Sequence, residues 1–216
     1  MPNVARMYDY YLGGKDNFAA DREAAEQIIK ISREAGSDVR EVARANRGFL
    51  IRAVRHLAEA GIRQFLDIGA GLPTQDNVHQ VAQRVAPGAK VVYVDNDPIV
   101  LVHARALLAG DADTVVLEGD LRDPAGIIAA AKAHLDFDRP IAVITAGVLH
   151  FFHDDAEVGR IIAALREPLV SGSHLVLSHT YIARRNRADA GVKEAEEIYR
   201  RTASGWIAWR DPETLR

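Results

Sequence analysis

The stretch Phe65-Leu66-Asp67-Ile68-Gly69-Ala70-Gly71 places two glycines directly after a short apolar run. Such a run is typical of a buried parallel strand. Gly69 permits the tight turn that must follow the strand, and Gly71 lets the backbone come close to a bound molecule. Open α/β sheets bind their ligands beyond the carboxyl ends of the strands, so we expect a binding site at this turn.

Similar apolar runs recur along the chain and alternate with stretches of helical spacing. The alternation predicts an α/β fold with a doubly wound, mostly parallel sheet, resembling the Rossmann arrangement. The predicted strands are Gln64–Ile68, Lys90–Val94, Thr114–Leu117, Ile141–Thr145 and His174–Leu177. The predicted helices are Asn77–Val85, Pro98–Ala109 before Gly110, one that starts at Asp123-Pro124, and one from Asp154 or Asp155 to Pro168.

The chain before the first strand has a mostly helical pattern. An amphipathic stretch from Val39 to Leu57 ends near Gly61. Upstream, the segment from Tyr10 to Phe18 indicates a structured loop before a helix over about residues 21–34. We therefore expect an N-terminal helical extension, a cap or lid, over residues 1–61 and a ligand-binding core over residues 62–216.

The C-terminus has an unusual pattern. Asp211-Pro212 is typical of a helix start, yet only Glu213-Thr214-Leu215-Arg216 follow, which scarcely make one turn. We expect the core to be truncated at this end, and a frayed natural tail is the alternative.

Composition restricts the function classes. The 216-residue chain has 27 basic and 30 acidic side chains, and its net charge of −3 argues against nucleic-acid binding through phosphate contacts alone. It has no cysteine, which excludes disulfides and thiolate metal sites. The N-terminus lacks a signal-peptide core, and no apolar run approaches the roughly 20 residues that span a bilayer. We therefore expect a cytoplasmic protein with no nucleic-acid or membrane partner, and no cluster has convincing metal-ligand spacing.

The residues around the first turn favour a cationic ligand. A dinucleotide fingerprint would need a third glycine at position 74, which is Thr74. Asp67 lies two residues before Gly69, where a carboxylate suits an ammonium group, such as that of S-adenosylmethionine, and repels a pyrophosphate. A purely structural strand-to-helix turn is the alternative.

Two further strands end in acidic residues. Asp95 ends the second predicted strand at a spacing that suits a carboxylate accepting both ribose hydroxyl protons, and Asn96 could contact the adenine edge. Asp120 follows the third strand and could accept a hydrogen bond from the adenine amino group, with Leu121 packing on the ring. Each aspartate could instead be a turn residue, and we interpret Asp97 as a helix cap.

These motifs resemble those of the class I S-adenosylmethionine-dependent methyltransferases. More narrowly, the chain resembles a bacterial family of this class that was once catalogued as a domain of unknown function. The similarity covers nearly the whole chain. The matching stretches are Ala5–Phe18, Ala45-Asn46-Arg47, Phe65–Thr74, Val92–Pro98 and Ala146–Phe151.

The resemblance implies S-adenosylmethionine as the cofactor and methyl transfer to a small-molecule acceptor, and it leaves a homodimer open. It implies that the segment from Thr145 through Ala146 and Gly147 to His150 lies beneath the transferable methyl group. It also implies a cofactor site lined by Asp67, Gly69, Ala70, Gly71, Asp95, Asn96, Asp120 and Leu121. A non-catalytic binding or regulatory protein and a dinucleotide-dependent oxidoreductase are the competing functions.

Methyl transfer from a sulfonium needs a base only when the acceptor atom must lose a proton. His150 is the foremost candidate base, and a surface or core-edge histidine is the alternative. His179, Tyr8 and Tyr11 are weaker candidates. Tyr11 could also form a lid over the cofactor or anchor the N-terminal segment.

Two basic features also have two interpretations. Arg47 could bind the methionine carboxylate of the cofactor or lie on a solvated helix face. The run Arg184-Arg185-Asn186-Arg187 could attract an anionic acceptor, although an exposed helix start is the simpler explanation.

Overall fold

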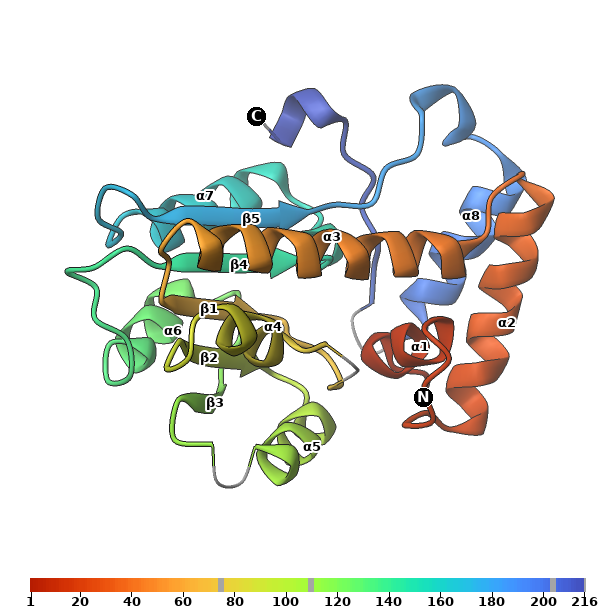
Figure 1. Cartoon of the computed structure of the whole chain (residues 1–216). Coiled ribbons are helices and arrows are strands. Elements are labelled where there is room, and N and C mark those ends of the chain that lie inside the picture. Colours follow the sequence, from red (N-terminus) through yellow and green to blue (C-terminus); the bar gives the residue numbers. More distant parts are fainter. Residues whose placement is uncertain (74–75, 109–110, 203–204, 216) are drawn as a thin grey trace. The chain divides into compact units, whose positions relative to one another are not determined.

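The computed structural model describes residues 1–73, 76–108, 111–202 and 205–215, and it contains the expected doubly wound sheet (Figure 1). Within this part of the chain, five parallel strands lie in the order β3-β2-β1-β4-β5. Their bounds agree with the predicted runs to within one residue, so the predicted fold class is confirmed. The strands are β1 (Gln64–Ile68), β2 (Lys90–Asp95), β3 (Thr114–Glu118), β4 (Ala142–Ala146) and β5 (His174–Ser178).

The chain forms two compact units, each built from separate stretches of sequence. The sheet unit comprises residues 48–148 and 155–178, and the helical unit comprises residues 1–47, 149–154 and 179–216. Helix α3 (Val39–Glu59) begins in the helical unit and ends in the sheet unit. The division into a cap over residues 1–61 and a core over residues 62–216 stays a prediction.

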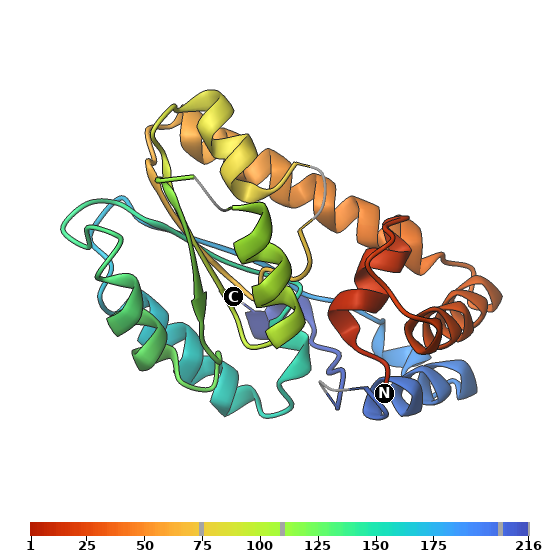
Figure 2. The ribbon, with the colours of Figure 1, turned by 90° about the horizontal axis from the view of Figure 1, so that it is seen from below.

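Helices cover both faces of the sheet. Figure 2 shows α6 and α7 along one face, and α4, α5 and the C-terminal part of α3 along the other. The bounds are α4 (Val78–Val85), α5 (Pro98–Leu107), α6 (Pro124–Ala131) and α7 (Asp155–Arg166). Ala109 and Gly110, which we expected to end α5, lie outside the described residues, as does Thr74.

The predicted helix starts are capped as their sequences suggest. The Asp97 carboxylate accepts a hydrogen bond from the Ile99 N–H over 2.8 Å, and proline occupies the first turn of α5. The Asp123 carboxylate accepts a hydrogen bond from the Gly126 N–H over 3.0 Å at the start of α6. Each cap satisfies a backbone donor that has no partner inside its helix.

The sheet core explains why the strands have apolar sequences. Every residue of β1 is buried, and Phe65, Leu66 and Ile144 have no exposed surface. Strands β3 and β5 are the outermost in the order and are only partly buried. Burial on both faces requires apolar side chains on both, which removes the alternation seen in half-buried strands.

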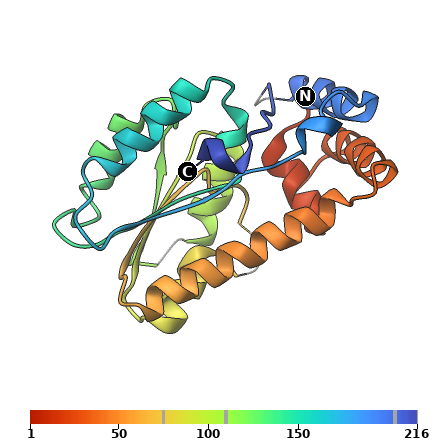
Figure 3. The ribbon, with the colours of Figure 1, turned by 90° about the horizontal axis from the view of Figure 1, so that it is seen from above.

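The helical unit packs α1 (Val4–Tyr11), α2 (Ala19–Glu34) and α8 (Ala190–Arg200) together, as Figure 3 shows. Met7, Ala25 and Ile29 lie in its core with at most 2% of their surface exposed. Three short 3₁₀ helices belong to the described part of this unit: η1 (Leu149–Phe151), η2 (Arg184–Asn186) and η3 (Pro212–Leu215).

Two parts of the helical unit correct the sequence prediction. Tyr10 and Tyr11 end helix α1, whereas we expected them to begin a loop. Helix α8 was not predicted at all. Both helices carry apolar residues at helical spacing, but the aromatic and glycine-rich N-terminus favoured a loop interpretation.

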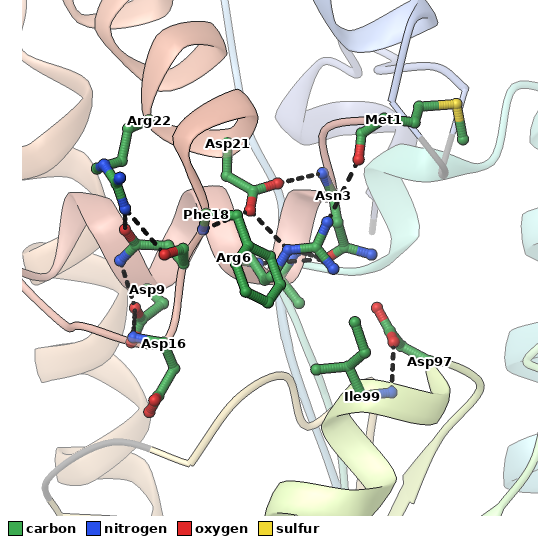
Figure 4. A network of polar contacts seen from close by, with 12 residues as sticks. Met1, Asn3, Arg6, Asp9, Asp16, Phe18, Asp21, Arg22, Asp97 and Ile99 are labelled. Atoms are coloured by element: carbon green, nitrogen blue, oxygen red, sulfur yellow. Dashed lines mark hydrogen bonds and ion pairs between the residues drawn. The ribbon is translucent and has the colours of Figure 1, made fainter.

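A polar network holds the N-terminal residues of the helical unit (Figure 4). Asp21 is fully buried, and its carboxylate accepts hydrogen bonds from Arg6 Nε over 2.6 Å and from the N–H groups of Asn3 and Phe18 over 2.9 Å each. The Asp9 carboxylate accepts from the side chain of Asn17 over 2.9 Å. Buried carboxylates with this many donors fix the loop between α1 and α2. Among the described residues, no helix is both long and apolar enough to cross a membrane.

Candidate functional site

The loops after β1, β2 and β3 meet at one edge of the sheet. The parallel register pairs Ile68 with Val94 and Asp95 with Glu118, so these strands end side by side. The Gly69 N–H donates to the Val94 carbonyl over 2.8 Å, and the Gly119 N–H donates to the Asp95 carbonyl over 3.0 Å. The sheet therefore brings together the strand-end residues that the sequence singled out.

Asp95 has a fixed side chain at the centre of this edge. Its Oδ2 accepts a hydrogen bond from the Gly71 N–H and its Oδ1 accepts one from the Asp97 N–H, each over 2.9 Å. Burial raises the pKa of the Asp95 carboxyl, and these backbone donors oppose that shift. Each oxygen has a second lone pair, so the carboxylate can still accept hydrogen bonds from a ligand.

The two glycines of the first turn have different structural requirements. Gly69 and Gly71 have φ angles of 73° and 66°, which favour glycine. A Cβ atom on Gly69 would lie 2.4 Å from Val148 Cγ2, whereas a Cβ on Gly71 would meet no atom within 4 Å. Gly69 is thus required for packing, and Gly71 faces open space, as expected at a turn that a ligand approaches.

Asn96 and Asp120 lie next to each other at the ends of β2 and β3. Asn96 Nδ2 donates to Asp120 Oδ2 over 3.1 Å, and Arg122 forms an ion pair with the same oxygen over 2.9 Å. Burial would raise the pKa of Asp120, but hydrogen bonds from the Arg122 N–H and from Asn96 outweigh it, so this pKa is lowered. Asp120 is therefore ionised at neutral pH, and the neighbouring Leu121 is buried.

Two polar side chains near the strand ends are almost fully buried. Asp67 is 6% exposed on β1, which lies between β2 and β4. Thr145 has no exposed surface, and its hydroxyl has no hydrogen-bond partner among the residues that the structure describes. Ala146 ends β4, and the N–H of Gly147 donates to the Ser178 carbonyl over 3.2 Å. A buried hydroxyl without a partner is costly, so a ligand could complete its hydrogen bonding.

Tyr11 and Arg47 belong to the helical unit. The Tyr11 ring is 4% exposed in the core of that unit, and burial, with a smaller effect of Tyr199, raises its pKa well above the usual value. This packing is what an anchor of the N-terminal segment requires. Burial raises the pKa of the Tyr8 hydroxyl, and the hydrogen bond from Asn46 and the charge of Arg47 oppose this shift. Arg47 itself is half-buried. The expected contacts of Tyr11 and Arg47 with the cofactor stay predictions.

His150 lies in η1, in the helical unit. Its ring centroid is 4.2 Å from that of Phe151 and 5.7 Å from that of His179. Its Nδ1 is buried and has no hydrogen-bond partner within the described ranges. Burial, followed by the charges of His179 and Arg210, lowers the pKa of His150 to about 3. The imidazole is therefore neutral at any physiological pH.

The sequence analysis did not single out Arg210, and it interpreted Asp211 only as part of a helix start. Arg210 is 4% exposed and donates to the carbonyls of Leu149 and Phe152 over 3.1 and 2.7 Å. Asp211 forms ion pairs with Arg184 and Arg187, so two of the three arginines of the basic run are paired with one carboxylate inside the helical unit. The opposite charges of Asp211 and the two arginines were the only sign of these ion pairs in the sequence, because no periodicity connects positions 24 to 27 residues apart.

The arrangement at the sheet edge suits a polar organic ligand. Among the described residues, no group of three or more His, Asp or Glu side chains could hold a metal. The edge offers carboxylates, backbone N–H groups beside glycines, and a buried hydroxyl. Such a set can bind the hydroxyl, amino and ammonium groups of a polar ligand.

Comparisons with known proteins agree with this geometry. A family model described as S-adenosyl methyltransferase matches residues 1–216. A candidate methyltransferase of known structure from Thermobifida fusca YX shares 43% identity and a TM-score of 0.88, over 99% of this chain and 78% of that one. A DUF574 family protein from Streptomyces avermitilis shares 40% identity and a TM-score of 0.87, over 99% and 80% of the two chains.

A more distant similarity concerns the fold alone. An O-methyltransferase family protein from Burkholderia thailandensis shares 16% identity and a TM-score of 0.53, over 82% of this chain and 52% of that one. No curated protein sequence matches the chain.

Proposed function

Because the chain belongs to the S-adenosyl methyltransferase family, we propose that it transfers the methyl group of S-adenosylmethionine to a small-molecule acceptor. The observation that supports this most directly is the pair of hydrogen bonds that orients the Asp95 carboxylate beside Gly71. A carboxylate fixed at the end of β2, next to a glycine turn, is well placed to bind a ribose.

The described residues fit this cofactor on independent grounds. Gly71 leaves open space where a side chain would otherwise stand, and the Thr145 hydroxyl is buried without a partner in the described chain. When bound, S-adenosylmethionine supplies a methyl group on a sulfonium, which is already activated for transfer. The protein then needs mainly to align the two reactants and exclude water.

Each strand-end residue has a proposed role. Asp95 accepts hydrogen bonds from the ribose hydroxyls, and Asn96, Asp120 and Leu121 bind the adenine. Asp67 attracts the ammonium group, because a buried carboxylate is stabilised by a nearby positive charge. The backbone of Gly69-Ala70-Gly71 approaches the cofactor, and the segment Thr145-Ala146-Gly147 borders the methyl group.

His150 is the proposed catalytic residue for the acceptor, and Tyr11 and Arg47 are proposed to contact the cofactor. The acceptor is proposed to be a small molecule. A cytoplasmic location and a homodimer also remain proposals.

Isothermal titration calorimetry tests the cofactor assignment. We expect the whole chain to bind S-adenosylmethionine and S-adenosylhomocysteine and to show no binding of NAD or NADP. Tight binding of a dinucleotide with no response to the sulfonium compound would instead support an oxidoreductase. Binding without turnover of labelled cofactor over a metabolite library would support a non-catalytic binding protein.

A further inference from the structure

A bridge of three polar side chains joins the loops that follow β2 and β3. Asp120 Oδ2 accepts two hydrogen bonds, one from Asn96 Nδ2 over 3.1 Å and one from Arg122 Nη1 over 2.9 Å. Asp120 Oδ1 accepts a third, from the backbone N–H of Arg122 over 2.9 Å. All three residues belong to the sheet unit, so the bridge is formed within one compact unit.

These hydrogen bonds favour the ionised form of Asp120. Each donor forms a stronger hydrogen bond with a carboxylate than with a neutral carboxyl group, and the guanidinium of Arg122 is permanently charged. Because a carboxylate can only accept, the Asn96 atom that faces Oδ2 is assigned as the amide nitrogen. Asn96 and Arg122 therefore hold the same carboxylate oxygen with one donor each.

The bridge leaves one accepting position for a ligand. A carboxylate oxygen accepts about two hydrogen bonds, so the two donors at Oδ2 occupy that oxygen. Among the described residues, Oδ1 accepts only from the Arg122 N–H, so it can accept one more hydrogen bond. The Asp120 side chain is 38% exposed, which leaves it accessible to a ligand. At this point the edge of the sheet presents an acceptor, and a ligand group that donates a hydrogen satisfies it.

Arg122 contacts both oxygens of Asp120, through its backbone N–H and through its guanidinium. Its side chain is 62% exposed, so water and salt screen the ion pair and its contribution to stability is small. The loss of the guanidinium should therefore change the orientation of the Asp120 carboxylate more than the stability of the fold.

We propose that Arg122 is a positioning residue of the cofactor site, which orients the Asp120 carboxylate so that the site selects a nucleoside with an amino group on its base over one with an oxygen at the same position. This inference rests on the proposed function, in which Asp120 binds the adenine. A 6-amino group donates a hydrogen to Oδ1, whereas a 6-oxygen would face it as a second acceptor and leave both without a hydrogen. The selected class is therefore the 6-aminopurine nucleosides, and the rejected class is the 6-oxopurine nucleosides.

Isothermal titration calorimetry of the whole chain with S-adenosylhomocysteine and S-inosylhomocysteine tests the inference. The two compounds differ only in the base, which is adenine in the first and hypoxanthine in the second. We expect the wild-type chain to bind S-adenosylhomocysteine about 10-fold more tightly or better, because an unsatisfied acceptor weakens binding. The readout is the ratio of the two dissociation constants, since an unfolded fraction of a sample affects both titrations equally.

Four variants separate the role of Arg122 from general effects. In Arg122→Met, which loses the guanidinium but keeps the backbone N–H, we expect the ratio to fall about two- to fivefold, the range for an exposed ion pair. Arg122→Lys retains the charge and should restore most of the ratio. Asp120→Asn presents an amide that can both donate and accept, so its ratio should approach one. Arg40→Met is the matched control and should leave the ratio unchanged, because it removes an ion pair with Asp38 in the helical unit.

A wild-type ratio near one, a wild-type ratio retained in Arg122→Met, or an equal fall in Arg40→Met would overturn the inference. A fall in Arg122→Met that Arg122→Lys reverses would support it. Failure of the proposed function would appear differently, as absent binding of both compounds to the wild-type chain.

Discussion

The backbone N–H of Gly71 donates to Asp95 Oδ2 over 2.9 Å, so the turn after β1 and the end of β2 are joined by a hydrogen bond to a side chain. The other carboxylate oxygen accepts from the Asp97 N–H. Both oxygens are therefore oriented before any ligand binds, and this reduces the entropy lost on binding.

Asp95→Asn should weaken S-adenosylmethionine binding by about 10- to 100-fold, since hydrogen bonds to a charged group contribute about 1.5–3 kcal/mol. An amide has one accepting oxygen, so it cannot serve both backbone donors. Calorimetry measures the change. Asp97→Asn is the matched control, because asparagine caps α5 equally well and the same charge is lost. Equal losses in the two variants would show that net charge alone matters.

Alanine at Gly69 should destabilise the protein more than alanine at Gly71. Both substitutions force a left-handed backbone, at roughly 1–2 kcal/mol each. At Gly69 the new Cβ also clashes with Val148 at 2.4 Å, which adds about 1–3 kcal/mol of overpacking. Urea unfolding of both variants gives the comparison. Equal stabilities would mean that the backbone moves freely at Gly69.

Thr145→Val should leave stability unchanged or raise it by about 1 kcal/mol, because it removes a buried hydroxyl that has no partner within the described chain. Thr114→Val is the control, since that hydroxyl donates to Asp111 over 2.6 Å and its loss should cost about 1 kcal/mol. Thermal unfolding distinguishes the two. If Thr145→Val also weakens S-adenosylmethionine binding, the hydroxyl forms a hydrogen bond with the ligand. A destabilised Thr145→Val would mean instead that the hydroxyl has a structural partner.

Asp21→Asn should destabilise the helical unit by about 3–5 kcal/mol, because it leaves Arg6 buried without its counter-ion. Burial acts to raise the pKa of Asp21, but Arg6 and two backbone N–H groups hold it below its usual value. The stabilisation is therefore complete above about pH 4 and is lost as pH falls through the lowered folded-state pKa.

Unfolding measured from pH 7 to pH 2 should show the wild-type chain approaching the stability of Asp21→Asn in acid. The exposed pair of Lys30 and Glu34 provides the control, and Glu34→Gln should change little at any pH. A constant difference between Asp21→Asn and wild type across the whole range would contradict the assignment.

Local sequence patterns predicted the sheet well because buried parallel strands need continuous apolar residues, as in Phe65–Ile68. The position of Asp95 at the end of β2 also follows from its place after an apolar run. Helix α1 was not predicted, because Gly13-Gly14 favours a loop. The structure shows that Asn3 caps this helix and that Met7 and Tyr11 share its buried face. The contacts of Arg210 with Leu149 and Phe152 could not be predicted, because they join positions 61 and 58 residues apart and no local spacing encodes them.

The helical unit is assembled from both ends of the chain, and this affects the order of folding during translation. Helices α1 and α2 leave the ribosome before α8, yet their apolar cluster includes Ile198 of α8. The sheet unit is completely synthesised once Ser178 has emerged. Since compact units fold as they become available, we expect α1 and α2 to reach their native packing only after the sheet unit has been synthesised.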